Sequence, residues 1–341
     1  MLSLVIIGLS IFVAIFAYYI SPDSTPDANR QIVEIQAKKP GYRQLFLKLK
    51  KEKSIPGTGL FKRLLYGAEE KFNLVPINRY QLTGDSIAIL KYVDEDVEQK
   101  MKIPATKAFS DNYIVSKFFW LGTDRFGRDI LSRLIVGTRI SLAVGLISVI
   151  ISLTIGIVLG SIAGYFKGRT DDIIMWLINV IWSIPTLLLV FGIALALGKG
   201  FWQIFIAVGL TMWVSVARLV RGQVLALREM EYIQAAKALG LTDTRIIARH
   251  ILPNVLGPVI VIAASNFATA IIVEAGLSFL GVGVQPPQPS WGLMIKENYN
   301  FIITHNPMLA LVPGIAIMIL VLAFNLLGNG LRDALDVKGK L

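Results

Sequence analysis

The sequence predicts an all-α integral membrane protein with six transmembrane helices, and three observations support this fold class. Of the 341 residues, 54% are hydrophobic, and the mean hydropathy is +0.63. A soluble domain rarely tolerates so much apolar content, because it has too little polar surface to stay dissolved. Six apolar segments reach the length of about 20 residues that a membrane-crossing helix needs. Lys and Arg lie between these segments and not inside them.

The six predicted spans are residues 2–20, 140–166, 173–197, 201–217, 255–277 and 308–327. Glu274, near the end of the fifth span, is the main acidic exception. The first segment could also be a signal peptide. Its apolar run is longer than the usual core of about 7–15 residues, and no Lys or Arg precedes it. An uncleaved first span, residues 1–20, is therefore favoured.

A large polar segment follows the first span. Residues 21–117 are rich in Lys, Pro and Gly, and are expected to form an extracytoplasmic loop domain with some short helices or strands. A docking surface is the alternative for this segment. The expected organisation continues with an elbow at 118–136, a transmembrane domain at 137–329 and a cytoplasmic tail at 330–341.

The basic residues predict the orientation, because short cytoplasmic connectors carry an excess of Lys and Arg. The second-to-third connector, the fourth-to-fifth connector and the tail are basic, whereas the other two short connectors hold only Lys199 and Lys296. Both termini are therefore expected in the cytoplasm. Four arginines before the second span count against this scheme, although Asp124 and Asp129 can offset some of their charge: Arg125, Arg128, Arg133 and Arg139.

Small residues and one proline stand out inside the predicted spans. Gly156, Gly160 and Gly164 lie on one face of the second span, where small residues let another helix approach closely. Pro185 removes one helical hydrogen bond and is expected to kink the third span. That kink could line a transport pathway or could be a packing accommodation. Candidate pathway residues are Trp182, Ser183, Pro185, Trp213 and Ser215.

Several kinds of chemistry are absent from the sequence. It contains no cysteine and only two histidines, His250 and His305, which are far apart. No metal, cofactor or catalytic residue is therefore expected, and the chain is not expected to be an enzyme. The net charge is +11, but the basic residues do not form a stripe that would indicate nucleic-acid binding. The phosphate-binding pattern G-x-x-x-x-G-K-[ST] is missing, so any ATP that drives this protein binds another chain.

The stretch YIQAAKALGLTDTRIIARHILPN, residues 232–254, interrupts the apolar pattern before the fifth span. It predicts a short helix that ends at Gly240, because glycine is a frequent helix terminator. Thr242 or Asp243 can cap a second helix that runs to Ile251, and Pro253 precedes the span. A compact elbow of two helices on the cytoplasmic face is therefore expected.

This elbow resembles the signature cytoplasmic "EAA" loop of permease subunits in binding-protein-dependent ABC importers. The family pattern is Glu-Ala-Ala, three residues, Gly, and a stretch that ends in Leu-Pro. Here Gln234-Ala235-Ala236, Gly240 and Leu252-Pro253 occupy those places. The chain departs from the pattern at Gln234, where the family often has Glu, which puts a charge contact at that position in doubt.

Further segments are similar to the peptide and nickel class of these importers, and to the second permease subunit of dipeptide and oligopeptide systems. They are LGTDRFGRDILSRLIVGTRISLAVG (121–145), AGYFKGRTDDIIM (163–175), EAGLSFLGVGVQPPQPSWG (274–292) and LGNGLRDALD (327–336). The resemblance covers residues 1–20 and 118–338. Residues 21–117 lie outside it.

The resemblance implies a type I ABC importer permease fold in the inner membrane of a bacterium, in contact with membrane lipid. Its implied partners are a second permease subunit, two ATPase subunits and an extracytoplasmic substrate-binding protein, and its implied role is peptide transport. The helix at 232–241 would couple to an ATPase subunit, and residues 281–306 would border the face that receives the binding protein. The implied coupling residues are Gln234, Ala235, Ala236, Leu239, Gly240 and Leu241.

Two other classes of function remain open at this stage. A self-sufficient secondary carrier or channel would work without ATPase partners. However, a proton-coupled carrier usually keeps acidic or His residues at depth in the membrane. An intramembrane enzyme would need a buried nucleophile, metal site or acid pair, and the sequence shows none.

Overall fold

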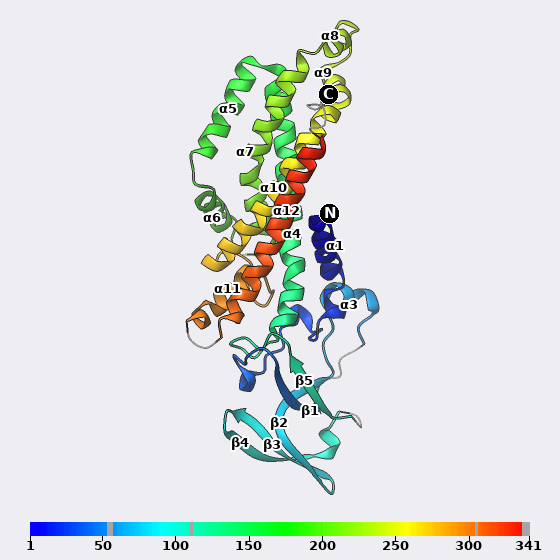
Figure 1. The fold of residues 1–341 in the computed structure, drawn as a ribbon, viewed down its shortest axis with the longest axis vertical. Coiled ribbons are helices and arrows are strands. Elements are labelled where there is room, and N and C mark those ends of the chain that lie inside the picture. Colours follow the sequence, from blue (N-terminus) through cyan, green and yellow to red (C-terminus); the bar gives the residue numbers. More distant parts are fainter. Residues whose placement is uncertain (53–56, 110–111, 199, 304–305, 336–341) are drawn as a thin grey trace. The chain divides into compact units, whose positions relative to one another are not determined.

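A computed structural model describes residues 1–52, 57–109, 112–198, 200–303 and 306–335 (Figure 1). Lys199, His305 and the second half of the predicted tail, residues 336–341, lie outside these ranges. The chain divides into two units. Unit 1 consists of Met1–Ser10, Ser141–Gln285 and Ala316–Leu341, and unit 2 consists of Ile11–Ile140 and Pro286–Ile315.

Within the described residues, four helical runs are long and apolar enough to cross a membrane, and a bent pair raises the number to five. The four are α4 (Ile130–Phe166), α7 (Phe201–Arg228), the run Asp243–Leu280 and α12 (Met308–Leu335). The run Asp243–Leu280 comprises α9 (Asp243–Ile246), the π-helical turn η4 (Ile247–Ile251) and α10 (Leu252–Leu280). Helix α4 begins earlier than the predicted second span, which starts at residue 140.

The first predicted span differs from the structure. It forms α1 (Leu2–Ile15) and the short α2 (Ala17–Ile20), which are separated at Phe16. Helix α1 has 14 residues, which at about 1.5 Å per residue are shorter than a hydrocarbon core of about 30 Å. The structure therefore supports four or five of the six predicted spans by length.

The third predicted span is broken. It consists of α5 (Gly168–Trp182) and α6 (Thr186–Leu197), whose axes differ by 93°. Pro185 lies directly before α6 and has no N–H to continue the ladder of α5. Proline also disfavours a helical backbone at the residue before it, Ile184. The expected kink is therefore a complete break between two helices.

In unit 1, helix α7 is the centre of the packing, with α5, α6 and α10 among its neighbours (Figure 1). It also packs against α4 through the three glycines that the sequence singles out. A Cβ atom built on Gly160 would lie 2.5 Å from the carbonyl oxygen of Ala217, and one on Gly164 would lie 2.8 Å from that of Arg221. A Cβ on Gly156 would lie 2.5 Å from the Cβ of Val216. The two backbones are therefore close enough to require glycine.

Unit 2 contains a five-stranded antiparallel sheet, which lies almost entirely in residues 21–117, where some short helices or strands were expected. Its order is β4-β3-β2-β1-β5. The strands are β1 (Tyr42–Lys50), β2 (Phe72–Thr83), β3 (Ser86–Asp94), β4 (Val97–Pro104) and β5 (Ile114–Phe119). Two-residue turns join β2 to β3 at Gly84–Asp85 and β3 to β4 at Glu95–Asp96. Positive φ angles at Gly84 and Asp96 allow these tight turns.

Both faces of the sheet carry buried side chains, because alternate residues of a strand point to opposite faces. Leu47, Ile77 and Ile87 belong to one cluster, whereas Phe46 and Phe119 belong to another. The second cluster also contains Ile32 and Ile35 from the segment that precedes β1. The shorter elements of unit 2 are η1 (Pro26–Ala28), η2 (Val33–Ile35), α3 (Leu60–Tyr66), η3 (Ala105–Lys107), α11 (Trp291–Asn298) and η5 (Tyr299–Ile302).

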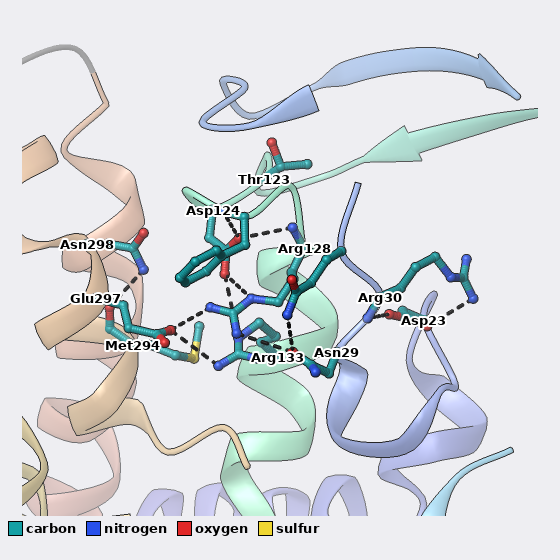
Figure 2. Close-up of polar contacts among 12 residues, drawn as sticks. Asp23, Asn29, Arg30, Thr123, Asp124, Arg128, Arg133, Met294, Glu297 and Asn298 are labelled. Carbon is teal, nitrogen blue, oxygen red and sulfur yellow. Dashed lines mark hydrogen bonds and ion pairs between the residues drawn. The ribbon is translucent and has the colours of Figure 1, made fainter. Parts of the chain in front are cut away.

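A buried group of four charged side chains connects α11 to the start of α4 within unit 2 (Figure 2). Arg128 donates from Nε to Asp124 Oδ2 and from Nη2 to Glu297 Oε2, both at 2.6 Å. Arg133 Nη2 lies 3.4 Å from the same Glu297 oxygen, and its Nε lies 3.8 Å from Asp124 Oδ2. Two cations thus face two carboxylates, as buried charges require.

This charge cluster bears on the four arginines that count against the predicted orientation. Arg128 and Arg133 are neutralised inside the unit, by Asp124 and by Glu297, a residue that the sequence analysis does not consider. Arg139 donates to the carbonyl oxygens of Leu64 and Leu65. Asp129, the other expected counter-charge, hydrogen-bonds Ser132 instead. Two of the four arginines therefore add no net charge to this region.

Candidate docking site at the α8–α9 elbow

Helix α8 (Glu231–Ala238) is the first half of the elbow, and its end is defined by Gly240. Gly240 has φ +80°, a left-handed conformation that glycine adopts without strain. The Gly240 N–H donates to Lys237 O at 3.0 Å, and the Leu241 N–H donates to Ala236 O at 3.2 Å. These two bonds form a Schellman motif, which satisfies carbonyl groups that a helix end leaves free. The chain therefore turns sharply into α9.

One face of α8 is buried against unit 1. Ile233 and Ala236, three residues apart, lie in a cluster with Val220 and Val224 of α7. Ile246 of α9 belongs to the same cluster. Residues at i and i+3 share a helix face, so α8 is held by this apolar contact along its length. Displacement of α8 would therefore act directly on the end of α7.

The other residues of α8, which is labelled in Figure 1, are exposed. Ala235 is exposed, and Leu239 is 80% exposed at the turn. Tyr232 and Met230 expose about half of their surfaces. A large aliphatic side chain so open to solvent, beside other apolar groups, is typical of a surface that a partner covers. The small side chain of Ala235 leaves the backbone accessible between them.

Polar contacts hold α9 and the end of α7 to the end of α4 and the residue that follows it. Tyr165 donates a hydrogen bond to Asp243 Oδ1 at 2.6 Å, and Arg228 Nη1 donates to Tyr165 O at 2.5 Å. Lys167 Nζ lies 2.5 Å from Glu229 Oε1, and this hydrogen bond lowers the pKa of Glu229. Asp243 therefore serves as a partner for Tyr165. Thr242 occupies the N-cap position of α9 without a side-chain capping bond.

The six residues that the family resemblance implies for coupling are divided between two environments. Gln234, Ala235, Leu239 and Gly240 are exposed, whereas Ala236 is buried and Leu241 is partly buried against the apolar cluster. Gln234 Nε2 donates to Glu229 O at 3.2 Å. Sequence reasoning did not single out Ile233, although its spacing of three from Ala236 is the signal of an anchoring face.

The candidate pathway residues do not form one surface. Trp213 is buried in a cluster with Ile178, Val214 and Ala217, so its ring cannot line a path that is open to solvent. Trp182 is exposed at the end of α5, and the guanidinium of Arg218 lies 3.5 Å from the centre of its ring. Ser183 and Pro185 lie in the break between α5 and α6, and Ser215 donates to Met212 O within α7.

Glu274 has a local structural contact. Its Oε1 accepts a hydrogen bond from Ser278 Oγ at 2.6 Å, one turn further along α10. The Ser278 hydroxyl in turn accepts from the Val284 N–H at 3.0 Å, beyond the end of the helix. Glu274 therefore helps to fasten the chain that follows α10.

Comparison with known proteins identifies the class of this chain. Residues 156–338, which contain the elbow and most of the apolar helices, match the family described as "Binding-protein-dependent transport system inner membrane component". The chain belongs to this family of transport components of the inner membrane. A chain of the MetNI methionine ABC transporter aligns with a TM-score of 0.50 at 20% identity, over 60% of this chain and 97% of that chain. This alignment shows a shared fold.

Three relatives from different bacteria are permease proteins of named transport systems. The dipeptide transport system permease protein DppC of Alkalihalophilus pseudofirmus is 38% identical over 94% of this chain and 97% of its own length. The glutathione transport system permease protein GsiD of Pectobacterium atrosepticum is 44% identical over 66% of this chain and 74% of its own. The oligopeptide transport system permease protein OppC of Bacillus subtilis is 43% identical over 65% of this chain and 73% of its own.

Proposed function

We propose that this chain is one of two permease subunits of an ATP-driven importer of the type I ABC fold that takes up peptides. It forms half of the translocation pathway, with both termini in the cytoplasm. Two ATPase subunits bind from the cytoplasmic side, and an extracytoplasmic binding protein delivers the substrate. The three relatives are named for dipeptide, oligopeptide and glutathione transport, which supports a short peptide as the substrate.

The observation that supports coupling is that the elbow has one buried face and one exposed face. Its inner face, at Ile233 and Ala236, packs on the end of α7, and its outer face presents Leu239 and Ala235. An ATPase subunit that covers the outer face would push on α7 through the inner face. Helix α7 contacts α4 at three glycines of α4, where there is no side chain that could shift to absorb a displacement. A push on α7 would therefore move α4 with it. ATP binding would then favour one of two transport conformations.

The first test is Leu239→Glu in the assembled complex with both ATPase subunits. A carboxylate at this exposed position leaves the chain folded but must be desolvated when a partner covers it, which costs several kcal/mol. We expect the ATPase subunits to dissociate during purification and ATP-dependent peptide uptake to fall at least about 10-fold.

Leu60→Glu is the matched control, because Leu60 of α3 is 78% exposed and receives the same substitution. This variant should retain its ATPase subunits. Full uptake and an intact complex with Glu at position 239 would contradict docking at the elbow.

A self-sufficient carrier is tested separately. Proteoliposomes that contain only this chain should show no peptide uptake with a proton gradient or with ATP. Uptake by the chain alone would refute the subunit assignment, whatever the result at position 239.

A further inference from the structure

Unit 2 contains a cavity of about 130 Å³ that is separate from the elbow. It lies beside β5 and the loop that leads into α4. Its volume is well above the ~10–15 Å³ that one water molecule needs on the same measure. Apolar and charged side chains both line it: Pro22, Asp23, Arg30, Ile32, Lys117, Phe118, Phe119 and Asp129, with the backbone of Gly127.

Asp129 is the buried acid of this cavity, and half of its carboxylate has no partner. Oδ2 accepts hydrogen bonds from the N–H of Ser132, at 2.9 Å, and from its hydroxyl. Oδ1 has no hydrogen-bond partner, although the residue is only 7% exposed. An unsatisfied buried acceptor is costly, and such groups are uncommon in folded proteins. This oxygen therefore lacks the donor that a buried acceptor normally has.

Lys117 supplies a positive charge from β5, and no hydrogen bond or ion pair to another described residue engages its ammonium group. The other two charged residues of the cavity are already occupied. Arg30 Nη2 lies 3.0 Å from Asp23 Oδ1 and 2.5 Å from Glu70 Oε1 (Figure 2 shows the Asp23 contact). The cavity thus offers one open carboxylate oxygen and one open ammonium group.

We propose that this cavity binds a small zwitterion of the amino-acid type. The ammonium group of the ligand donates to Asp129 Oδ1, and its carboxylate pairs with Lys117. An apolar side chain of the ligand lies against Ile32 and Phe119. The proposal does not rest on the elbow or on the proposed function.

The surroundings of the two charges favour a ligand with both charges over a ligand with one. Burial raises the pKa of Asp129 and lowers the pKa of Lys117, because it removes water from the charged form of each group. A zwitterion brings an opposite charge to each group and adds no net charge to the cavity, where Lys117 already lies near Asp23, Glu70 and Asp129. Gly127 keeps the wall in place, because it has φ +71° and a Cβ atom there would collide with the carbonyl oxygen of Ile32.

The experiment is calorimetric titration of L-leucine into the purified full-length chain in detergent micelles. The wild type should bind with saturable heat. Asp129→Asn and Lys117→Gln should each weaken binding at least about 10-fold, because each removes one charge-assisted contact. Lys117→Gln keeps the test decisive if the Asp129 variant does not fold, since Lys117 loses no hydrogen bond or ion pair with another described residue.

Controls separate a zwitterion site from a site for a single charge. Asp94→Asn and Lys102→Gln change exposed residues of the same sheet and should bind leucine normally. L-leucinamide lacks the carboxylate and 4-methylpentanoate lacks the ammonium, so each should bind at least about 10-fold more weakly. Equal binding of either analogue would overturn the proposal. It would also be overturned by no saturation up to about 10 mM, or by unchanged affinity in both cavity variants.

Discussion

At the scale of single residues, Glu297 has the largest structural effect that the sequence analysis did not foresee. Its carboxylate oxygen faces Arg128 at 2.6 Å and Arg133 at 3.4 Å, and all three side chains are nearly inaccessible to solvent. Arg128 and Glu297 are separated by 169 positions in the chain, so no local pattern connects them. A carboxylate that sits between two buried arginines offsets a desolvation cost that neither arginine could otherwise bear.

We therefore expect Glu297→Ala to destabilise the chain by about 3–5 kcal/mol, because two buried cations would share one remaining carboxylate. Thermal unfolding of the purified chain in micelles measures the effect. Glu95→Ala is the control, since Glu95 pairs with Lys38 at 2.9 Å while its side chain is 82% exposed. Such surface pairs contribute about 0–1 kcal/mol. Equal loss in the two variants would show that the buried cluster has no special role.

At the scale of elements, α4 and α7 are in close contact because three positions on α4 have no side chain. The glycines at 156, 160 and 164 recur every four residues and form a flat strip along α4. Val216, Ala217 and Val220 of α7 fill the space that side chains would need. Small residues at this spacing are a known basis for close helix packing in membranes. The spacing predicts a close contact, but it does not identify α7 as the neighbour.

Gly160→Ala should push the two helices apart, because the added methyl group meets a backbone oxygen at 2.5 Å. Overpacking of this kind costs about 1–3 kcal/mol, which a lower unfolding midpoint would reveal. Gly222→Ala on α7 provides the comparison, since a Cβ there meets no atom within 4 Å. It should leave stability unchanged or slightly higher, because Ala favours a helix more than Gly does. A midpoint unchanged by the alanine at 160 would contradict the tight contact.

At the scale of the whole molecule, the orientation that we propose across the membrane rests on the distribution of charge. Arg218, Arg221 and Arg228 belong to the predicted fourth-to-fifth connector, and in the structure they lie in the last part of α7. The pairing of Arg128 and Arg133 with carboxylates removes part of the charge that opposes this orientation. The elbow and the sheet are therefore expected on opposite sides of the membrane.

Because the chain contains no cysteine, single cysteines can test this orientation without background. Thr244→Cys on α9 should react with a membrane-impermeant maleimide only after the cells are permeabilised. Val97→Cys on β4, where the residue is 51% exposed, should react in intact cells. Labelling of position 244 from outside would contradict the proposed topology and, with it, docking of a cytoplasmic ATPase.

The sheet shows why part of the fold could not be predicted from composition. Only part of the sheet is buried: in β3, buried Ile87 and Ile89 alternate with partly exposed residues, and β4 is exposed at every residue except Ile103. The average polarity of the segment therefore resembles that of a loop. Two-residue turns join three of the strands. The turn at Gly84–Asp85 is a hairpin signal that the sequence analysis did not use. The sequence analysis allowed some short strands in residues 21–117, but hydrogen bonds between distant strands assemble them into one sheet.

The sequence by itself determined the features that arise from short stretches of chain. Apolar runs indicated the long helices, Gly240 indicated the end of α8, and Pro185 indicated the break before α6, because hydropathy, a positive φ and a missing N–H are local properties. Only the tertiary structure decided which side chains meet across the fold. The charge cluster at Glu297, the anchoring of Ile233 on α7, and the cavity between Lys117 and Asp129 depend on residues that are distant in sequence and are joined only when the chain packs.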